Sequence, residues 1–336
     1  MRRRAFIRTC SLATVGAGVA HRTVATAQTR LSDAGARAIT ALNMAKQLEI
    51  KGDFKSIQTA YHSDAILVEP GSLQPNIGRA SIAQNLQKGA GKRRLLYFYY
   101  RQPQVVELGN AALVVSNYEA GYESGGKTTE DSGKTTNVVV LGSDQPVITQ
   151  DVQVPNIYAG GYGPLGTALS APKFGLFPIR VLGREPTTAK SAGGGENDVL
   201  FNQVRQINES WVTGRAEDLL KYANRSGVFL VGDYSPFYLS GIEDVRQHFA
   251  DFYRTSKVTF VREVAPTVRI WGDMAAVAFN FDLDYTINGK PRRSPGRAVY
   301  TFAKGGSEVG QWAMAACAAS HLVLRDIGDP YPLNLD

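Results

Sequence analysis

Cysteine and histidine are scarce in this sequence. Its 336 residues include two cysteines and four histidines. If the basic leader described below is removed, Cys317 is the one cysteine left, which excludes an internal disulfide in the mature protein. We interpret Cys317, which stands among alanines, as a small buried hydrophobic residue. The remaining histidines, His62, His248 and His321, are not at the spacing of metal ligands, so we predict no metal site and no cofactor.

Long apolar runs and a broad excess of positive charge are also lacking. After the leader, no stretch of ~20 apolar residues occurs, so we predict no membrane span. The formal net charge is +7, but residues 1–27 hold five arginines and no acidic residue. The part of the chain from Gln28 onward is therefore almost neutral, which argues against nucleic acid as a partner.

The first 27 residues predict an export signal. The basic run Arg2–Arg8 is followed by a short apolar stretch, and Ala25-Thr26-Ala27 then offers the small residues that a signal peptidase needs. The basic run resembles the twin-arginine signal of bacteria. The alternative, a membrane anchor, is disfavoured because the apolar stretch is short and rich in glycine and alanine. We therefore predict a periplasmic or secreted bacterial protein without residues 1–27.

An internal repeat divides the rest of the chain into two copies. The repeat is marked by four glycine pairs 162 or 163 residues apart: Gly52 and Gly214, Gly78 and Gly241, Gly109 and Gly272, and Gly133 and Gly296. Between the copies the sequence is rich in glycine and proline, which is typical of a linker. We predict a first domain at 31–157, a linker at 158–196 and a second domain at 197–327.

Apolar periodicity predicts the same order of elements in both copies. In the first copy we expect helices near 39–52, 54–61 and 81–88, and strands at 66–69, 95–108, 111–122, 136–141 and 147–154. In the second copy we expect helices near 204–211, 219–220 and 245–252, and strands at 228–231, 258–264, 275–287, 297–303 and 312–324. Helices followed by a run of antiparallel strands indicate an α+β unit.

Several short motifs carry a family resemblance. In the first copy they are Gly52-Asp53, the segment Tyr61–Pro70 and the segment Gly78–Ile82, and in the second copy the segments Gly241–Val245 and Gly296–Phe302. The chain resembles the SnoaL-like branch of the nuclear-transport-factor-2-like superfamily, which includes the ketosteroid isomerases. The resemblance implies two cone-like α+β domains, each a strongly curved, mostly antiparallel sheet wrapped on three helices, whose interior binds a small, largely apolar molecule. Because this fold hosts both enzymes and binding modules, it does not name a reaction.

Glu69 is the strongest candidate for chemistry. The strand at 66–69 alternates, which puts Glu69 on the same face as Leu67. If Leu67 faces the interior, burial raises the pKa of the Glu69 carboxyl and makes it a base near neutral pH. By the resemblance, Glu69 before Pro70 takes the place of the carboxylate that transfers protons in ketosteroid isomerases. The alternative is a solvated or arginine-paired glutamate at the rim.

Asn137 is the second catalytic candidate. It shares a face with Val139 and Leu141, and by the resemblance it takes the place of the isomerase acid that donates a hydrogen bond to the oxyanion. The alternative is an asparagine that caps a turn. The isomerase tyrosine donor on the first helix corresponds to Ala45, which cannot donate a hydrogen bond. This departure argues against a true steroid isomerase.

The second copy offers a different pair of polar residues. Asp233, which is in phase with Val231, echoes Glu69 under an alignment that is open by one residue, and Tyr300 corresponds to Asn137 of the first copy. We predict that Asp233, Tyr300 and, in the first copy, Tyr61 contact a polar group of the ligand. The alternative is that bulky side chains simply fill the second interior.

Two classes of function remain open. The first is an enzyme that transfers a proton, as isomerases and cyclases do, or activates water for hydrolysis, through Glu69. The second is a non-catalytic ligand-binding or protein-interaction module. An open interior that contains Glu69 and Asn137 favours the enzyme, and filled interiors favour the module. We also predict that the two copies pack sheet to sheet as an intramolecular pseudo-dimer, in a protein that is monomeric or weakly homodimeric.

Overall fold

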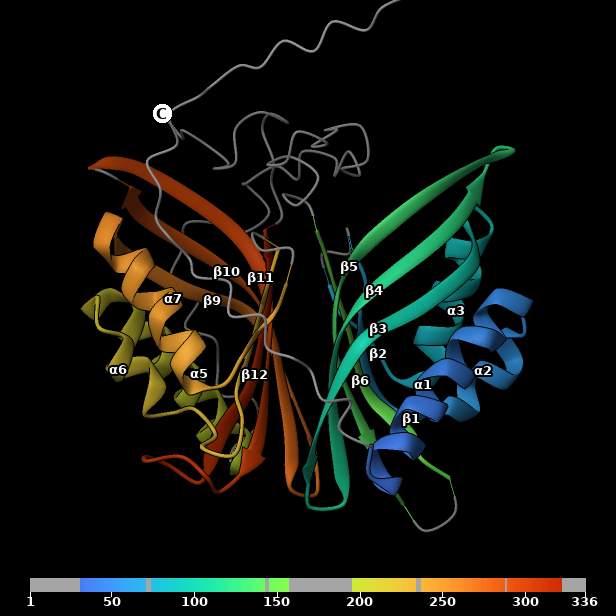
Figure 1. The fold of residues 1–336 in the computed structure, drawn as a ribbon, viewed down its shortest axis with the longest axis horizontal. Coiled ribbons are helices and arrows are strands. Elements are labelled where there is room, and N and C mark those ends of the chain that lie inside the picture. The colour runs from blue at the N-terminus through green and yellow to red at the C-terminus, as the bar shows by residue number, and fades with distance from the viewer. Residues whose placement is uncertain are drawn as a thin grey trace, which may run out of the picture. The chain divides into compact units, whose positions relative to one another are not determined.

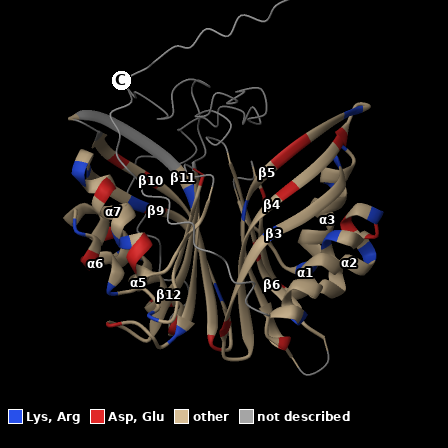
Figure 2. Ribbon diagram, in the orientation of Figure 1, with Lys and Arg blue, Asp and Glu red and all other residues tan. Residues whose placement is uncertain are grey.

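The structure is a computed structural model that describes residues 31–70, 74–142, 145–156, 195–233, 237–287 and 289–321. The predicted leader and nearly all of the predicted linker lie outside these residues. The described residues form two six-stranded sheets, each with helices against one face (Figure 1). None of the described helices is long and apolar enough to cross a membrane. Figure 2 shows charged residues of both signs scattered over the helices and the ends of the strands.

The first domain begins with two helices and a strand that packs beside them. Its elements are α1 (Asp33–Lys51), α2 (Phe54–Ala60), β1 (Tyr61–Val68), β2 (Asn76–Ile77), α3 (Arg79–Ala90), β3 (Arg94–Leu108), β4 (Ala111–Ser124), β5 (Lys127–Val140) and β6 (Val147–Pro155). The strand order is β2-β1-β6-β5-β4-β3. Only β1 and β6 run parallel among the described pairs; the others are antiparallel. The strand β5 begins nine residues before the predicted 136, because its polar first half pairs with the end of β4.

The second domain repeats this arrangement. Its elements are α5 (Glu196–Thr213), α6 (Ala216–Leu220), β7 (Phe229–Gly232), β8 (Leu239–Ser240), α7 (Ile242–Thr255), β9 (Ser256–Trp271), β10 (Met274–Ile287), β11 (Lys290–Lys304) and β12 (Trp312–His321). The strand order β8-β7-β12-β11-β10-β9 matches that of the first sheet element by element. The predicted α+β class with two similar domains is confirmed.

One glycine pair shows why the repeat preserves glycine. A Cβ atom at Gly133 would lie 2.5 Å from the ring of Tyr118, and one at Gly296 would lie 2.1 Å from the ring of Phe281. Tyr118 faces Gly133 across β4 and β5, and Phe281 faces Gly296 across β10 and β11. At the same place in both sheets an aromatic ring therefore packs against a glycine, where no side chain is in the way.

The faces of the two sheets that turn away from the helices contribute to one buried apolar cluster. It includes Val68 and Val138 of the first domain and Val231 and Val299 of the second. Hydrogen bonds also join the domains: the Tyr238 hydroxyl donates to the backbone oxygen of Gln102 (3.0 Å), Ser240 Oγ donates to Gln104 Oε1 (2.8 Å), and Thr301 Oγ1 donates to Gln150 Oε1 (3.0 Å). We call the opposite face of each sheet, which packs on its helices, the inner face.

Candidate functional site

The inner face of the first sheet has an apolar base. Leu42 of α1, Ile82 of α3, Leu67 of β1 and Val114 of β4 are fully or almost fully buried in one cluster. Burial of such side chains stabilises the fold by roughly 1.5–3 kcal/mol each. This packing fixes the two helices and the strands that carry the polar side chains described next.

Asp151 lies at the centre of a buried polar network on this face. In the sheet register Asp151 of β6 lies between Leu67 of β1 and Asn137 of β5. Asn137 Nδ2 donates to Asp151 Oδ1 (3.0 Å), and the Tyr61 hydroxyl donates to Asp151 Oδ2 (2.9 Å). All three side chains are buried. The two residues predicted from the sequence, Asn137 and Tyr61, thus both donate hydrogen bonds to the Asp151 carboxylate.

Lys46 of α1 brings a positive charge into this network. Its ammonium lies 3.6 Å from Asp151 Oδ2, 3.1 Å from Glu49 Oε2 and 4.9 Å from the centre of the Phe98 ring. Burial lowers the pKa of Lys46, but the nearby charges of Asp151 and Glu49 hold that pKa well above its ordinary value. The side chain therefore remains a buried ammonium at neutral pH.

Glu69 lies at the edge of the same network. It follows β1 directly and is half-buried, and Asn85 Nδ2 of α3 donates a hydrogen bond to its carboxyl. Burial raises the pKa of Glu69 to about 7, and the negative charges of Glu49 and Asp151 act in the same direction against the opposing charge of Lys46. The carboxyl can therefore both accept and release a proton near neutral pH.

Further polar side chains continue along the inner face. Ser116 of β4 and Thr135 of β5 face each other with their hydroxyls 2.9 Å apart, and Gln153 of β6 lies opposite Thr135. All three are buried. The first domain therefore has a polar stripe across β4, β5 and β6 where a fold of this size usually places apolar side chains.

The second domain replaces this stripe with apolar and aromatic residues. By register and repeat spacing, the residues that correspond to Lys46, Ser116, Thr135, Asn137 and Asp151 are Asn208, Phe279, Ala298, Tyr300 and Cys317. The Tyr300 hydroxyl donates to Asn208 Oδ1 (2.6 Å), and Asn208 Nδ2 donates to Glu263 Oε1 (2.5 Å). Burial raises the pKa of the Cys317 thiol to about 12, so it stays protonated.

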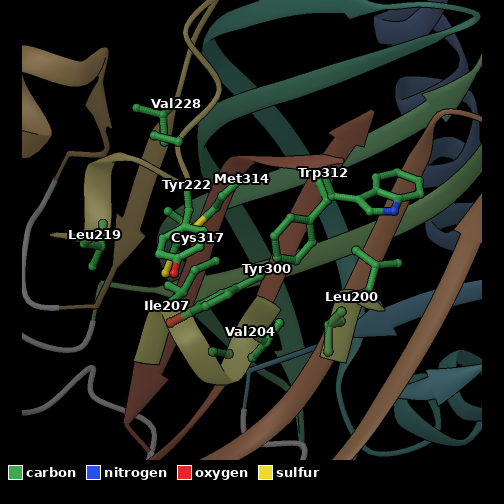
Figure 3. Packing of buried hydrophobic residues seen from close by; sticks show 14 of the residues in the cluster. Leu200, Val204, Ile207, Leu219, Tyr222, Val228, Tyr300, Trp312, Met314 and Cys317 are labelled. Carbon is green, nitrogen blue, oxygen red and sulfur yellow. The ribbon is translucent and has the colours of Figure 1, made fainter. Parts of the chain in front are cut away.

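Side chains fill the second interior. A cavity in this interior, lined by residues that include Trp211, Phe249, Tyr300 and Cys317, has a volume of about 10 Å³, which holds about one water molecule. Figure 3 shows Tyr300, Met314 and Cys317 close together within this core. A small-molecule ligand does not fit there without movement of these side chains.

Asp233 and Tyr300 are not brought together. Phe229 and Val231, which are in phase with Asp233, belong to the cluster shared by the two sheets, whereas Tyr300 lies on the inner face. Since β7 pairs with β12 through Leu230 and Cys317, the residue that corresponds to Glu69 is Gly232. The predicted equivalence was displaced by one residue, and a one-residue step reverses the face of a strand.

Asp233 instead lies near two buried cations. Its charge raises the pKa of Lys134 and of Arg297, while burial, which is the larger effect, lowers these pKa values to about 8 and about 10. Lys134 and Arg297 occupy corresponding positions in β5 and β11. This ionic group therefore belongs to the region where the sheets share their apolar cluster.

Four residues of the site were not predicted from the sequence: Lys46, Glu49, Asn85 and Asp151. A signal for Asp151 was present, because Asp151 and Gln153 alternate with Val152 and Val154 in β6. Such alternation normally places the polar residues toward solvent. Here the valines face the other sheet, so the polar residues face the interior.

Comparison with known proteins gives matches in structure only. No family model and no curated protein matches this sequence. A ketosteroid isomerase-like protein from Erwinia carotovora atroseptica matches with 12% identity over 38% of this chain and 95% of its own, with a TM-score of 0.34. The β subunit of benzoate 1,2-dioxygenase from Burkholderia mallei matches with 14% identity over 36% and 89%, with a TM-score of 0.32.

ActVI-ORFA from Streptomyces coelicolor is a third match, with 15% identity over 36% of this chain and 95% of its own and a TM-score of 0.32. Each match has about the length of one domain. Both domains are α+β units with one shared order of helices and strands, the architecture that the resemblance to the nuclear-transport-factor-2-like superfamily implied. That assignment rests on the order of helices and strands within each domain, and it leaves the chemistry of the chain to its own residues.

Proposed function

We propose that the first domain transfers a proton to or from a small, largely apolar molecule, with Glu69 as the acid and base. The observation that carries this proposal is a half-buried carboxyl with a pKa of about 7 beside a buried network of charges. A general base works best when its pKa lies near the working pH. Groups with shifted pKa values gather at functional sites. In the second domain the residue that corresponds to Glu69 is Gly232, so the fold itself does not require a carboxyl at this position.

The other residues of the network have distinct roles in this proposal. Lys46 supplies positive charge for a negative charge that develops on the substrate, as a preorganised electrostatic group does. Asn137 donates to Asp151, so it acts as a positioning residue in place of the oxyanion donor that the resemblance implied. Asn85 orients the Glu69 carboxyl from α3.

Deuterium exchange tests the proposal without knowledge of the substrate. The protein is incubated in D₂O with a set of small carbonyl compounds, and deuterium incorporation is followed by mass spectrometry. We expect incorporation that Glu69→Gln lowers by at least about a hundredfold, since general base catalysis supplies a factor of that order. Glu209→Gln, which removes an exposed carboxylate from α5, is the matched control. Equal exchange in both variants, or a Glu69 pKa near 4.5 by NMR, contradicts the proposal.

For the second domain we propose a non-catalytic interaction role, because its interior is filled. Its sheet covers the first sheet as the partner subunit does in a dimer, which makes the chain an intramolecular pseudo-dimer that is monomeric or weakly homodimeric. The shared apolar cluster and the hydrogen bonds between the domains support this. Light scattering after gel filtration and ¹⁵N relaxation test it. A stable dimer, or independent tumbling of the two domains, overturns it.

We also propose export to the periplasm through residues 1–27. The support is the arginine-rich start and the Ala25-Thr26-Ala27 cleavage pattern. In a bacterial host, replacement of Arg3 and Arg4 by lysine should leave the protein in the cytoplasm with an uncut leader. Export that is unchanged by the replacement excludes the twin-arginine route.

A further inference from the structure

The part of the chain that carries Glu69 lies against the second domain. Strand β1 ends at Val68, directly before Glu69, and Gln74 and Pro75 lead into β2. Val68, Gln74 and Pro75 line a cavity of about 10 Å³ together with residues of the second sheet. Arg297 of β11 is one of these residues. Val68 also packs in the apolar cluster that the two sheets share, so Glu69 begins where the first sheet meets the second.

Arg297 is a buried cation that feels acids of both domains. Its side chain is buried, and its Nε donates to Ser320 Oγ of β12 (3.0 Å). Burial lowers the pKa of Arg297 to about 10, while the charges of Asp233 and then of Glu69 act in the opposite direction. Tyr118 acts on Arg297 only when it is ionised, and burial raises the pKa of this tyrosine well above its ordinary value. At neutral pH the guanidinium therefore stays charged between a carboxyl of each domain.

The cation of the first domain has the reverse relation. Lys134 of β5 takes the place of Arg297, and its Nζ donates to Asn156 Oδ1 (2.5 Å). The charge of Asp233 raises the pKa of Lys134 against the larger effect of burial. Asp233 and Glu69 each follow the first strand of their domain directly. The repeat thus places one buried cation in each domain that acts on the acid after the first strand of the other domain.

We propose that Arg297 of the second domain is a positioning residue for Glu69, which holds the end of β1 in place and favours the ionised carboxylate. The inference rests on the proposed function, because it names a residue that regulates the same site. A proton is abstracted by the ionised form, so a nearby cation enlarges the active fraction at neutral pH. The groups with the largest effect on Glu69 come from the first domain: Glu49, Lys46, Asp151 and Asn85.

Removal of the Arg297 charge tests this proposal. Without the guanidinium the neutral carboxyl is favoured, so Arg297→Met should raise the pKa of Glu69 by about 0.5 from its value of about 7 in an NMR titration. Deuterium exchange should then fall about twofold at pH 7 and recover at pH 9, where Glu69 is ionised in both proteins. A merely structural defect would lower exchange at both pH values. Arg297→Lys keeps the charge and should restore most of the exchange at pH 7.

Lys134→Met is the matched control. It removes the corresponding buried cation, which acts on Asp233, and should leave the titration of Glu69 unchanged. The proposal is overturned if Arg297→Met folds and does not alter the pKa of Glu69. It is also overturned if Lys134→Met raises that pKa equally, since the effect would then come from loosened contact between the sheets.

A measurement on the unmodified protein covers the case in which Arg297→Met does not fold. The NMR signal of the Arg297 Nε–H should shift with a midpoint near pH 7, and Glu69→Gln should abolish this shift, because the coupling between two titrating groups is reciprocal. A signal that ignores the titration of Glu69 removes the positioning role and leaves the proton-transfer function. A Glu69 pKa near 4.5 removes both.

Discussion

The two domains share a strand order but have opposite interiors. Where the first sheet places Asp151 and Asn137, the second places Cys317 and Tyr300. The first interior is a hydrogen-bonded network of charged groups, and the second is an aromatic core with room for about one water. The comparison shows that the sheet and helices do not need the network in order to form.

The difference also separates stability from chemistry. Apolar burial in the second domain stabilises by about 25 cal/mol per Å² of surface removed from water. A buried ion pair such as Lys46 and Asp151 contributes little, because desolvation of both charges offsets their attraction. We infer that the second domain contributes mainly stability and the first domain contributes the reactive groups.

The largest effect is expected from a cavity in the filled interior. Phe249 of α7 is buried and contacts Trp211 edge to face at 4.8 Å. Phe249→Ala should lower the free energy of unfolding of the second domain by about 4 kcal/mol. Tryptophan fluorescence in urea reports on this domain and on its contact with the first sheet. The three tryptophans, Trp211, Trp271 and Trp312, all lie in the second domain, and Trp271 belongs to the shared cluster. Val212→Ala, at a half-exposed position, is the control; an equal effect would mean that the interior is not tightly packed.

The charged interior should be sensitive to loss of one partner. Asp151→Asn leaves the Lys46 ammonium buried with Glu49 as its remaining partner, and should destabilise the first domain by about 3 kcal/mol. Hydrogen exchange of the β5 amides measures this without the tryptophan signal. A change below about 1 kcal/mol would show that water reaches Lys46, which would weaken the contrast between the domains.

A pH dependence should distinguish the first domain. The pKa of Glu69 is about 7 in the folded protein against an ordinary 4.5, so the folded state holds this proton more tightly than the unfolded state. The resulting stability is complete below pH 4.5 and is lost as the pH rises to about 7. Glu69→Gln should remove this loss and raise the unfolding free energy at pH 8 by about 2 kcal/mol. Urea titrations at pH 5 and pH 8 check it, and a flat profile in both proteins contradicts it.

The smallest effect is expected at the position that corresponds to Asp151. Cys317→Ala removes one buried sulfur atom from an apolar core and should cost about 1 kcal/mol, measured by tryptophan fluorescence in urea. Activity in the deuterium exchange assay should not change. A loss of activity in this variant would mean that the second interior takes part in the reaction.

Much of the fold follows from local pattern. Apolar periodicity predicts the order of helices and strands, and the recurring glycines predict the repeat. The first half of β5 is missed because its run Lys127–Thr135 has no apolar residue and includes aspartate and glycine, which are depleted in strands. It becomes a strand through pairing with β4, which is a long-range effect that periodicity does not contain.

The candidate site is only partly predictable for a related reason. Glu69 is found because its strand phase follows that of a buried leucine. Lys46 and Asp151 are missed because charged residues on amphipathic elements normally face water. Their true direction depends on the second sheet, which buries the valines of β6 and leaves the polar face for the interior. For Asp233 the error runs in the opposite direction. An alignment shifted by one residue predicts that its side chain faces the interior, whereas its strand phase places it on the other face.

The matching strand orders have a consequence for folding. Since β3–β6 and β9–β12 are alike in order and length, the strands of one domain can dock on the helices of the other while the chain folds. The chemistry of the two interiors disfavours such an exchange. If Cys317 lay opposite Lys46, the buried ammonium would lose one of its two carboxylate partners. If Asp151 lay beside Phe249, a charge would be buried among aromatic rings. Because the two interiors differ in chemistry, the helices of each domain pack more stably on the strands of their own domain than on those of the other.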